Sequence, residues 1–239
     1  MDEARAQPVA GIAQAVEVHR LAVAGREADI ARQVGRRVAR VWLRTSRFAD
    51  VDALTSATLH LGPDSRAFYD RGRARSATGR PHLALADYEQ ALSLYRDAGD
   101  RRNTAASLNN IGLGFSGLGD HQRALAHFEQ ALAILRDVGD RAGEATTLNN
   151  IGGIKFGQGD LDGALKTLHQ VLDLVRAVGD RGTEAATNFN MAAVLARMAR
   201  TRDAIDMQLR AISLAEATEH PDLPAMRAYL KELQDQKGH

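Results

Sequence analysis

The chain has 239 residues, of which 44% are hydrophobic, and a formal net charge of +1. This composition fits one large or two small folded domains and excludes a disordered chain. The absence of cysteine excludes disulfides, thiolate catalysis and cysteine–zinc sites. No apolar run reaches the ~20 residues of a membrane span, and the acidic start MDEARAQ is unlike a secretory signal, so we expect a cytoplasmic protein without membrane association.

The N-terminal third carries the weakest pattern. In residues 1–27, Pro8 can open a helix that runs to about Ala24, because proline is tolerated in a first helical turn. Residues 28–64 predict a degenerate helix pair, whose first helix has one apolar face formed by Ile30, Val34, Val38, Val41 and Trp42.

Residues 65–224 contain four units with a period of forty residues. The sequence Gly-Asp-Arg recurs at 99–101, 139–141 and 179–181. Small residues recur in step with it, at Gly72, Gly112, Gly152 and Ala192, and at Ala84, Ala124, Ala164 and Ala204. Such a regular spacing indicates stacked copies of one supersecondary unit.

Each unit predicts two amphipathic helices. Leu108, Ile111, Gly112 and Phe115 follow helical spacing in the first helix of one unit, and residues 124–135 do so in the second. Glycine is suited to the left-handed end of a helix and aspartate to capping the next, so Gly119-Asp120 predicts the turn between them.

These motifs resemble the tetratricopeptide repeat, in its longer form of about forty residues that is similar to kinesin light chains and Pins-type scaffolds. The family pattern is met by Gly112, Gly119, Ala124, Phe128 and Ala131. The later units depart from it, with Leu168 and Val171 in one and Ala199 in place of the turn glycine in the next. In residues 28–64 the resemblance matches Trp42 to the aromatic of the first helix and Pro63 to the closing proline.

The resemblance implies an all-α, right-handed α-solenoid of antiparallel helix pairs that runs without a linker. Residues 225–239 are expected to form a capping helix and tail, and the apolar stripe of that helix begins at Leu223 and continues through Met226, Leu230 and Leu233. The family is an interaction scaffold, so the resemblance implies no catalysis and no cofactor.

Helical geometry predicts which residues face the concave wall of such a stack. Asn110 points about 150° away from the packed face of its helix. The wall residues predicted as a peptide-binding groove are Arg66, Asp70, Arg73, Asn110, Leu113, Asn150, Asn190 and Arg197.

Two interpretations of the asparagines remain open. A primary amide both donates and accepts, so Asn110, Asn150 and Asn190 suit the backbone of an extended peptide, as similar asparagines do in kinesin light chain-like repeats and peptide-pheromone receptors. Alternatively, the amides bond the neighbouring repeat and stiffen the stack. For Asn109 and Asn149, on the flank of the face, we expect inter-repeat bonding.

The N-terminal end is basic. On residues 28–44 the apolar face leaves Arg36, Arg40 and Arg44 outward, whereas the repeat register selects Arg37 in place of Arg36. Arg40 and Arg44 belong to both sets and, with Arg66 and Arg73, predict a cationic end suited to an acidic peptide. A solvated arginine-rich face is the alternative.

The sequence therefore predicts a non-catalytic adaptor that binds a peptide or a segment of a partner protein. A regulatory or sensor domain of a bacterial signalling system is the alternative function. The eight histidines lack metal-ligand spacing, and no phosphate-binding loop is present. Nucleic-acid binding is not expected, because the net charge is near zero and the arginines lack interleaved aromatics. Self-association through the ends of the stack or the groove stays open.

Overall fold

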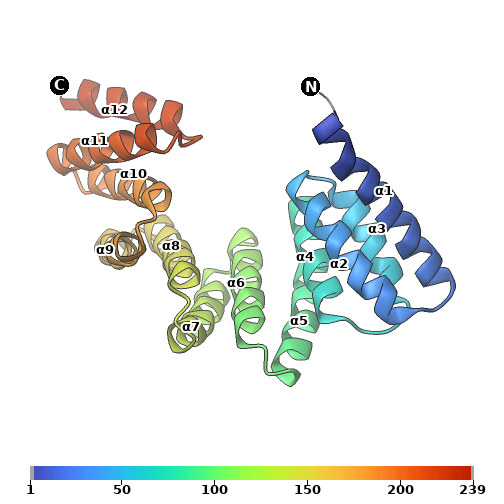
Figure 1. Cartoon of the computed structure of the whole chain (residues 1–239). Coiled ribbons are helices and arrows are strands. Elements are labelled where there is room, and N and C mark those ends of the chain that lie inside the picture. The colour runs from blue at the N-terminus through green and yellow to red at the C-terminus, as the bar shows by residue number, and fades with distance from the viewer. Residues whose placement is uncertain (1–2, 238–239) are drawn as a thin grey trace. The chain divides into compact units, whose positions relative to one another are not determined.

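Figure 1 shows the computed structural model of the chain, in which residues 3–237 are described. The described residues form helices and turns without strands, and consecutive helices pack on one another within two compact units. The units are Met1–Asp120 and His121–His239, and each is described by itself. The predicted all-α class is confirmed.

Unit 1 consists of the N-terminal helix, the degenerate pair and the first regular helices. Its helices are α1 (Glu3–Ala24), α2 (Ala28–Arg44), α3 (Phe48–Leu59), α4 (Ser65–Ala77), α5 (Pro81–Asp97) and α6 (Arg101–Gly117). α1 starts before Pro8, which therefore lies inside the helix and does not open it. The fixed φ of proline is compatible with a helix, and the bond it cannot donate lies close to the helix start.

Unit 2 repeats the same arrangement. Its helices are α7 (His121–Asp137), α8 (Arg141–Gln158), α9 (Leu161–Val178), α10 (Arg181–Arg197), α11 (Thr201–Ala217) and α12 (Leu223–Lys237). The apolar stripe of α12 docks on α11, with Met226 and Leu233 fully buried. The buried Gln208 on α11 fixes this helix further, since its Nε2 donates to the carbonyl oxygen of Met226 at 2.6 Å.

The turns follow the predicted chemistry. The turn glycines Gly79, Gly99, Gly119, Gly139, Gly159 and Gly179 all have positive φ, between 67° and 82°. Asp100, Asp140, Asp160 and Asp180 each accept a hydrogen bond from the backbone N–H three residues on, which caps the following helix. Ala199 adopts the same left-handed conformation, with φ 58°, although its Cβ disfavours it.

Small residues let the two helices of a pair approach closely. A Cβ added at Gly72 on α4 would lie 2.7 Å from the ring of Tyr88 on α5, so only glycine fits there. At Gly152 on α8, which occupies the same repeat position, the added Cβ would lie 3.5 Å from Leu168 on α9. That is an ordinary van der Waals distance.

An ion-pair network joins α3, α4 and α5 in unit 1. The buried Asp87 receives hydrogen bonds from Arg71 and an ion pair from Arg75 at 2.9 Å. Arg75 also contacts Asp52 at 3.2 Å, and Arg80 binds the same carboxylate at 2.7 Å. This network connects the degenerate pair to the first regular repeat through charge.

A second buried carboxyl group belongs to Asp70 on α4, which is only 1% exposed. Its Oδ2 accepts a hydrogen bond from Arg66 Nε at 2.9 Å, while Oδ1 is buried without a hydrogen-bond partner. Burial raises the pKa of Asp70 above its ordinary value, and the opposing effect of Arg66 does not compensate.

The two glycines above predict opposite effects of the same substitution. Gly72→Ala should destabilise the fold by roughly 1–3 kcal/mol, because its methyl group overlaps the buried Tyr88 ring. Gly152→Ala should stabilise by about 0.5–1 kcal/mol, since alanine is the better helix residue and the space is free. Urea unfolding followed by far-UV circular dichroism measures both. Equal effects of the two variants would contradict this difference in packing.

The raised pKa of Asp70 predicts a pH dependence. A carboxyl group whose pKa is higher in the folded chain binds its proton more tightly there, so its ionisation lowers stability as the pH rises from 3.8 through the folded pKa. Relative to Asp70→Asn, the native chain should therefore lose free energy of unfolding over this range. Urea titrations between about pH 4 and 7 measure the difference. Asp203→Asn, at a half-exposed carboxylate, is the control, and a pH-independent difference for Asp70→Asn would contradict the prediction.

Candidate functional site

In the first helix of each regular pair, one residue occupies the repeat position predicted to face the concave wall, here called the inner-face position, and the residue before it occupies the flank position. The inner-face positions are Asp70, Asn110, Asn150 and Asn190, and the flank positions are Tyr69, Asn109, Asn149 and Phe189. Asp70 occupies the asparagine position of the first unit, yet it is buried beside Arg66 and offers no exposed carboxylate to a ligand.

In unit 1, Asn110 bonds the preceding repeat. Its Nδ2 donates to the hydroxyl oxygen of Tyr69 at 2.8 Å, and this contact is partly buried. Tyr69 is itself held by aromatic contacts with Tyr88 and Tyr95, whose ring centroids lie 5.8 and 6.4 Å away. Asn110 thus stiffens the stack, which is the second of the two interpretations of the asparagines.

In unit 2, the same register joins Asn190 to Asn149. Asn190 Nδ2 donates to Asn149 Oδ1 at 3.3 Å in an exposed contact, so the inter-repeat bond expected for Asn149 is present. Asn150 is partly buried. A primary amide has two N–H donors and a carbonyl acceptor. Within the described part of the chain, the NH2 group of Asn149 and Oδ1 of Asn190 have no other hydrogen bond.

The remaining inner-face residues predicted for the groove differ in their surroundings. Leu113 on α6 is 44% exposed. Arg197 on α10 is exposed, and its Nη1 donates to the carbonyl oxygen of Phe156 at 3.0 Å while its guanidinium lies 4.7 Å from the Phe156 ring centroid. Arg197 therefore adds a side-chain donor to a carbonyl in the last turn of α8, which also accepts from the N–H of Gly159.

A small pocket opens between α8 and α10 in unit 2, and we call it the α8–α10 pocket. Its volume is about 130 Å³. The lining consists of one amide pair and apolar groups, namely Asn149, Gly152, Gly153, Phe156, Leu168, Asn190, Ala193 and Val194. The pocket thus combines hydrogen-bonding groups with an apolar wall, as a site for a peptide side chain requires.

The predicted cationic residues lie in unit 1. Arg40 and Arg44 on α2 and Arg73 on α4 are exposed, and no ion pair forms at any of them among the described residues. Arg66 is different, because it pairs with Asp70 and lies 5.6 Å from the Tyr69 ring centroid. Three of the four predicted cations are therefore available to an anionic partner.

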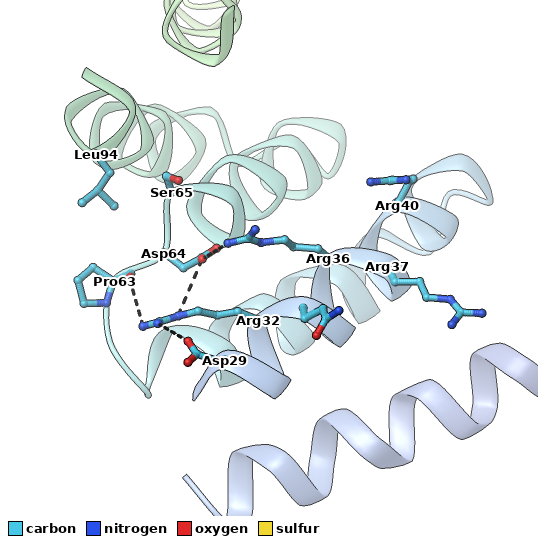
Figure 2. A pocket seen from close by; sticks show the side chains of 10 residues that line it. Asp29, Arg32, Arg36, Arg37, Arg40, Pro63, Asp64, Ser65 and Leu94 are labelled. Carbon is cyan, nitrogen blue, oxygen red and sulfur yellow. Dashed lines mark hydrogen bonds and ion pairs between the residues drawn. The ribbon is translucent and has the colours of Figure 1, made fainter. Parts of the chain in front are cut away.

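A larger, basic pocket lies between α2 and the start of α4, with a volume of about 810 Å³. Figure 2 shows Arg32 and Arg36 extending toward Asp64, which caps α4. Arg36 Nη2 is 2.8 Å from Asp64 Oδ2, and Arg32 Nε is 3.9 Å from it. Arg37 and Arg40 also line this pocket, so its four arginines outnumber the acidic Asp29 and Asp64.

Several residues of these sites were missed by the sequence analysis. Tyr69 could have been found, since it stands forty residues before Asn109 at the flank position. The contacts of Arg32 and Arg36 with Asp64 could not have been found in this way, because periodicity does not reveal which arginine meets which carboxylate. Phe189 on α10 packs against Tyr229 on α12 with ring centroids 5.7 Å apart.

The described residues contain no group of histidine, aspartate or glutamate side chains arranged to hold a metal ion. No helix among them is both long and apolar enough to cross a membrane.

Comparisons with solved structures show the fold. BtubC (BKLC) from P. vanneervenii is 20% identical over 88% of this chain and 92% of its own, with a TM-score of 0.74. A putative kinesin light chain repeat protein from Podosopora anserina is 14% identical over 78% of this chain and 95% of its own, with a TM-score of 0.64. The Rap conjugation gene regulator of plasmid pLS20, in complex with the Phr* peptide, is 15% identical over 87% of this chain and 60% of its own, with a TM-score of 0.69.

No curated protein matches the chain in sequence. The tetratricopeptide repeat model, however, matches residues 64–137 and 143–217, which together make up more than half of the chain. The chain therefore belongs to the tetratricopeptide repeat family, and its fold is the predicted α-solenoid of antiparallel helix pairs.

Proposed function

We propose that this protein is a cytoplasmic, non-catalytic adaptor that binds an extended segment of a partner protein on the inner faces of its repeats. The observation that carries the proposal is the exposed amide pair of Asn149 and Asn190 beside an apolar pocket. Such a surface offers an extended chain both backbone hydrogen bonds and room for a side chain.

In this proposal the amides of Asn149 and Asn190 bond both each other and the bound segment. Asn190 uses one N–H on Asn149, and the remaining donors and acceptor of the pair are directed to the main chain of the bound segment. A bond to the neighbouring repeat also restricts the side-chain rotamers before binding, which reduces the entropy lost when the ligand arrives.

The charges of unit 1 favour an acidic partner. Arg40, Arg44 and Arg73 are exposed, and the pocket between α2 and α4 has a surplus of arginine over acidic residues. Guanidinium groups bind carboxylates in bidentate fashion. We therefore assign acidic residues of the partner to unit 1.

A peptide sensor is the second candidate function. It is supported by the similarity to the Rap regulator of pLS20, which was solved with the Phr* peptide, although this chain spans only 60% of that protein. A sensor binds a free peptide, whereas an adaptor binds a segment inside a longer chain. Dependence of affinity on free peptide termini therefore separates the two.

The test starts with selection of a phage-displayed library of random linear peptides on the full chain. Peptides that bind are then measured by isothermal titration calorimetry against the native chain and against Asn149→Ala/Asn190→Ala. Loss of two hydrogen-bonding side chains should weaken binding about tenfold or more. The same peptides with acetylated and amidated ends test the requirement for free termini.

The control is Gln170→Ala on α9, which removes an exposed amide outside the inner face. It should leave affinity unchanged. If the library yields no binder, or if the double variant binds every selected peptide as the native chain does, the groove proposal is wrong. Strong binding only by peptides with free ends would favour the sensor.

A further inference from the structure

The α8–α10 pocket has features that repeat packing alone does not require. α8 carries Gly152, Gly153 and Gly157 within six residues, although glycine is the least favourable helix residue after proline. A Cβ added at Gly153 or Gly157 would meet nothing within 4 Å. Neither of these two glycines is therefore needed for a close approach of helices.

The equivalent position in unit 1 shows that the repeat accepts a large side chain there. Leu113 on α6 stands forty residues before Gly153 and is 44% exposed. A leucine at this position projects over the preceding turn of the same helix, because side chains on a helix point toward its N-terminus. The glycine at 153 keeps open a space that leucine occupies in α6.

The size and lining of this space define what fits. A cavity of about 150 Å³ with apolar walls holds a molecule the size of benzene. The α8–α10 pocket, at about 130 Å³, is slightly smaller, and no charged residue lines it. A branched aliphatic side chain matches this volume and these walls.

The two ends of the pocket carry different polar groups. At one end Asn149 and Asn190 offer amide groups suited to a main chain. At the other end Arg197 lies over Phe156, with one N–H bound to the Phe156 carbonyl oxygen. A guanidinium has five N–H donors, and no carboxylate among the described residues pairs with Arg197. An incoming carboxylate would therefore complement its charge.

From these observations we infer that the α8–α10 pocket selects one branched aliphatic residue, of the size of leucine, next to an acidic residue that Arg197 binds. The inference rests on the proposed function and adds to it the sequence preference of the bound segment. Gly153 makes the preference possible, because a side chain as large as leucine at this position would occupy the pocket. Arg197 is then both a donor to the last turn of α8 and a contact for the ligand.

The test uses three capped dipeptides, acetyl-Leu-Asp-amide, acetyl-Ala-Asp-amide and acetyl-Leu-Asn-amide. Each is titrated into the ¹⁵N-labelled full chain, and NMR shift changes give the dissociation constant, expected on the order of 1 mM for ligands this small. The alanine peptide should bind about tenfold or more weakly, since it buries three fewer carbon atoms. The asparagine peptide should bind about two- to fivefold more weakly, as for an exposed ion pair.

Two variants assign the preferences to residues. Gly153→Leu should abolish the preference for leucine over alanine, and its thermal unfolding should not fall below that of the native chain, because the site is open and glycine is the poorer helix former. Arg197→Gln should abolish the preference for aspartate over asparagine and keep the preference for leucine. Gly117→Leu on α6 is the matched control, since a Cβ there also meets nothing within 4 Å, and it should change neither preference.

The inference is overturned if no shifts occur at the pocket residues, if leucine and alanine peptides bind equally, or if Gly153→Leu retains the preference. Its failure is distinct from failure of the proposed function. Peptides selected from the library that weaken with Asn149→Ala/Asn190→Ala would still support binding by the amide pair, without the preferences for leucine and aspartate. Absence of any selected peptide would remove both.

Discussion

The packing of neighbouring helices on one another is the constraint on which the rest of the structure depends. At Gly72 on α4 the helices are so close that the ring of Tyr88 on α5 occupies the space that a side chain at position 72 would need. Left-handed glycines and aspartate caps at the turns then fix where each helix ends and the next begins. Because these features recur every forty residues, α6 meets α4 in unit 1 in the same register as α10 meets α8 in unit 2.

This register determines which residues of neighbouring first helices in a unit form hydrogen bonds with each other. The bonds of Asn110 to Tyr69, of Asn190 to Asn149 and of Arg197 to Phe156 all span 41 residues. A single geometric relation therefore joins three different chemical pairs, one in unit 1 and two in unit 2. Asn110 and Asn190, which the sequence predicts to meet a ligand, therefore both bond a neighbouring repeat.

Much of this architecture could be predicted from the sequence because it is local or periodic. The packed face of Leu108, Ile111 and Phe115 is buried as predicted, and the turn residues adopt the expected conformations. Long-range polar pairing could not be predicted in the same way. The chain has many arginines near many carboxylates, and only the folded geometry decides that Arg36 meets Asp64 and that Asp70 is buried with Arg66. The site at Gly153 was missed for another reason, since its property is the absence of a side chain.

The N-terminal part of unit 1 is held together by ion pairs around Asp87 in addition to apolar packing. Arg71, Arg75 and Asp87 are mostly shielded from solvent, with side chains 16%, 17% and 4% exposed. Dissolved ions screen such shielded pairs weakly, so high salt does little to loosen them. The dehydration penalty of charged groups also falls on warming, whereas the gain from apolar burial levels off. The junction between the degenerate pair and the first regular repeat is therefore a part of this protein whose relative strength grows with temperature.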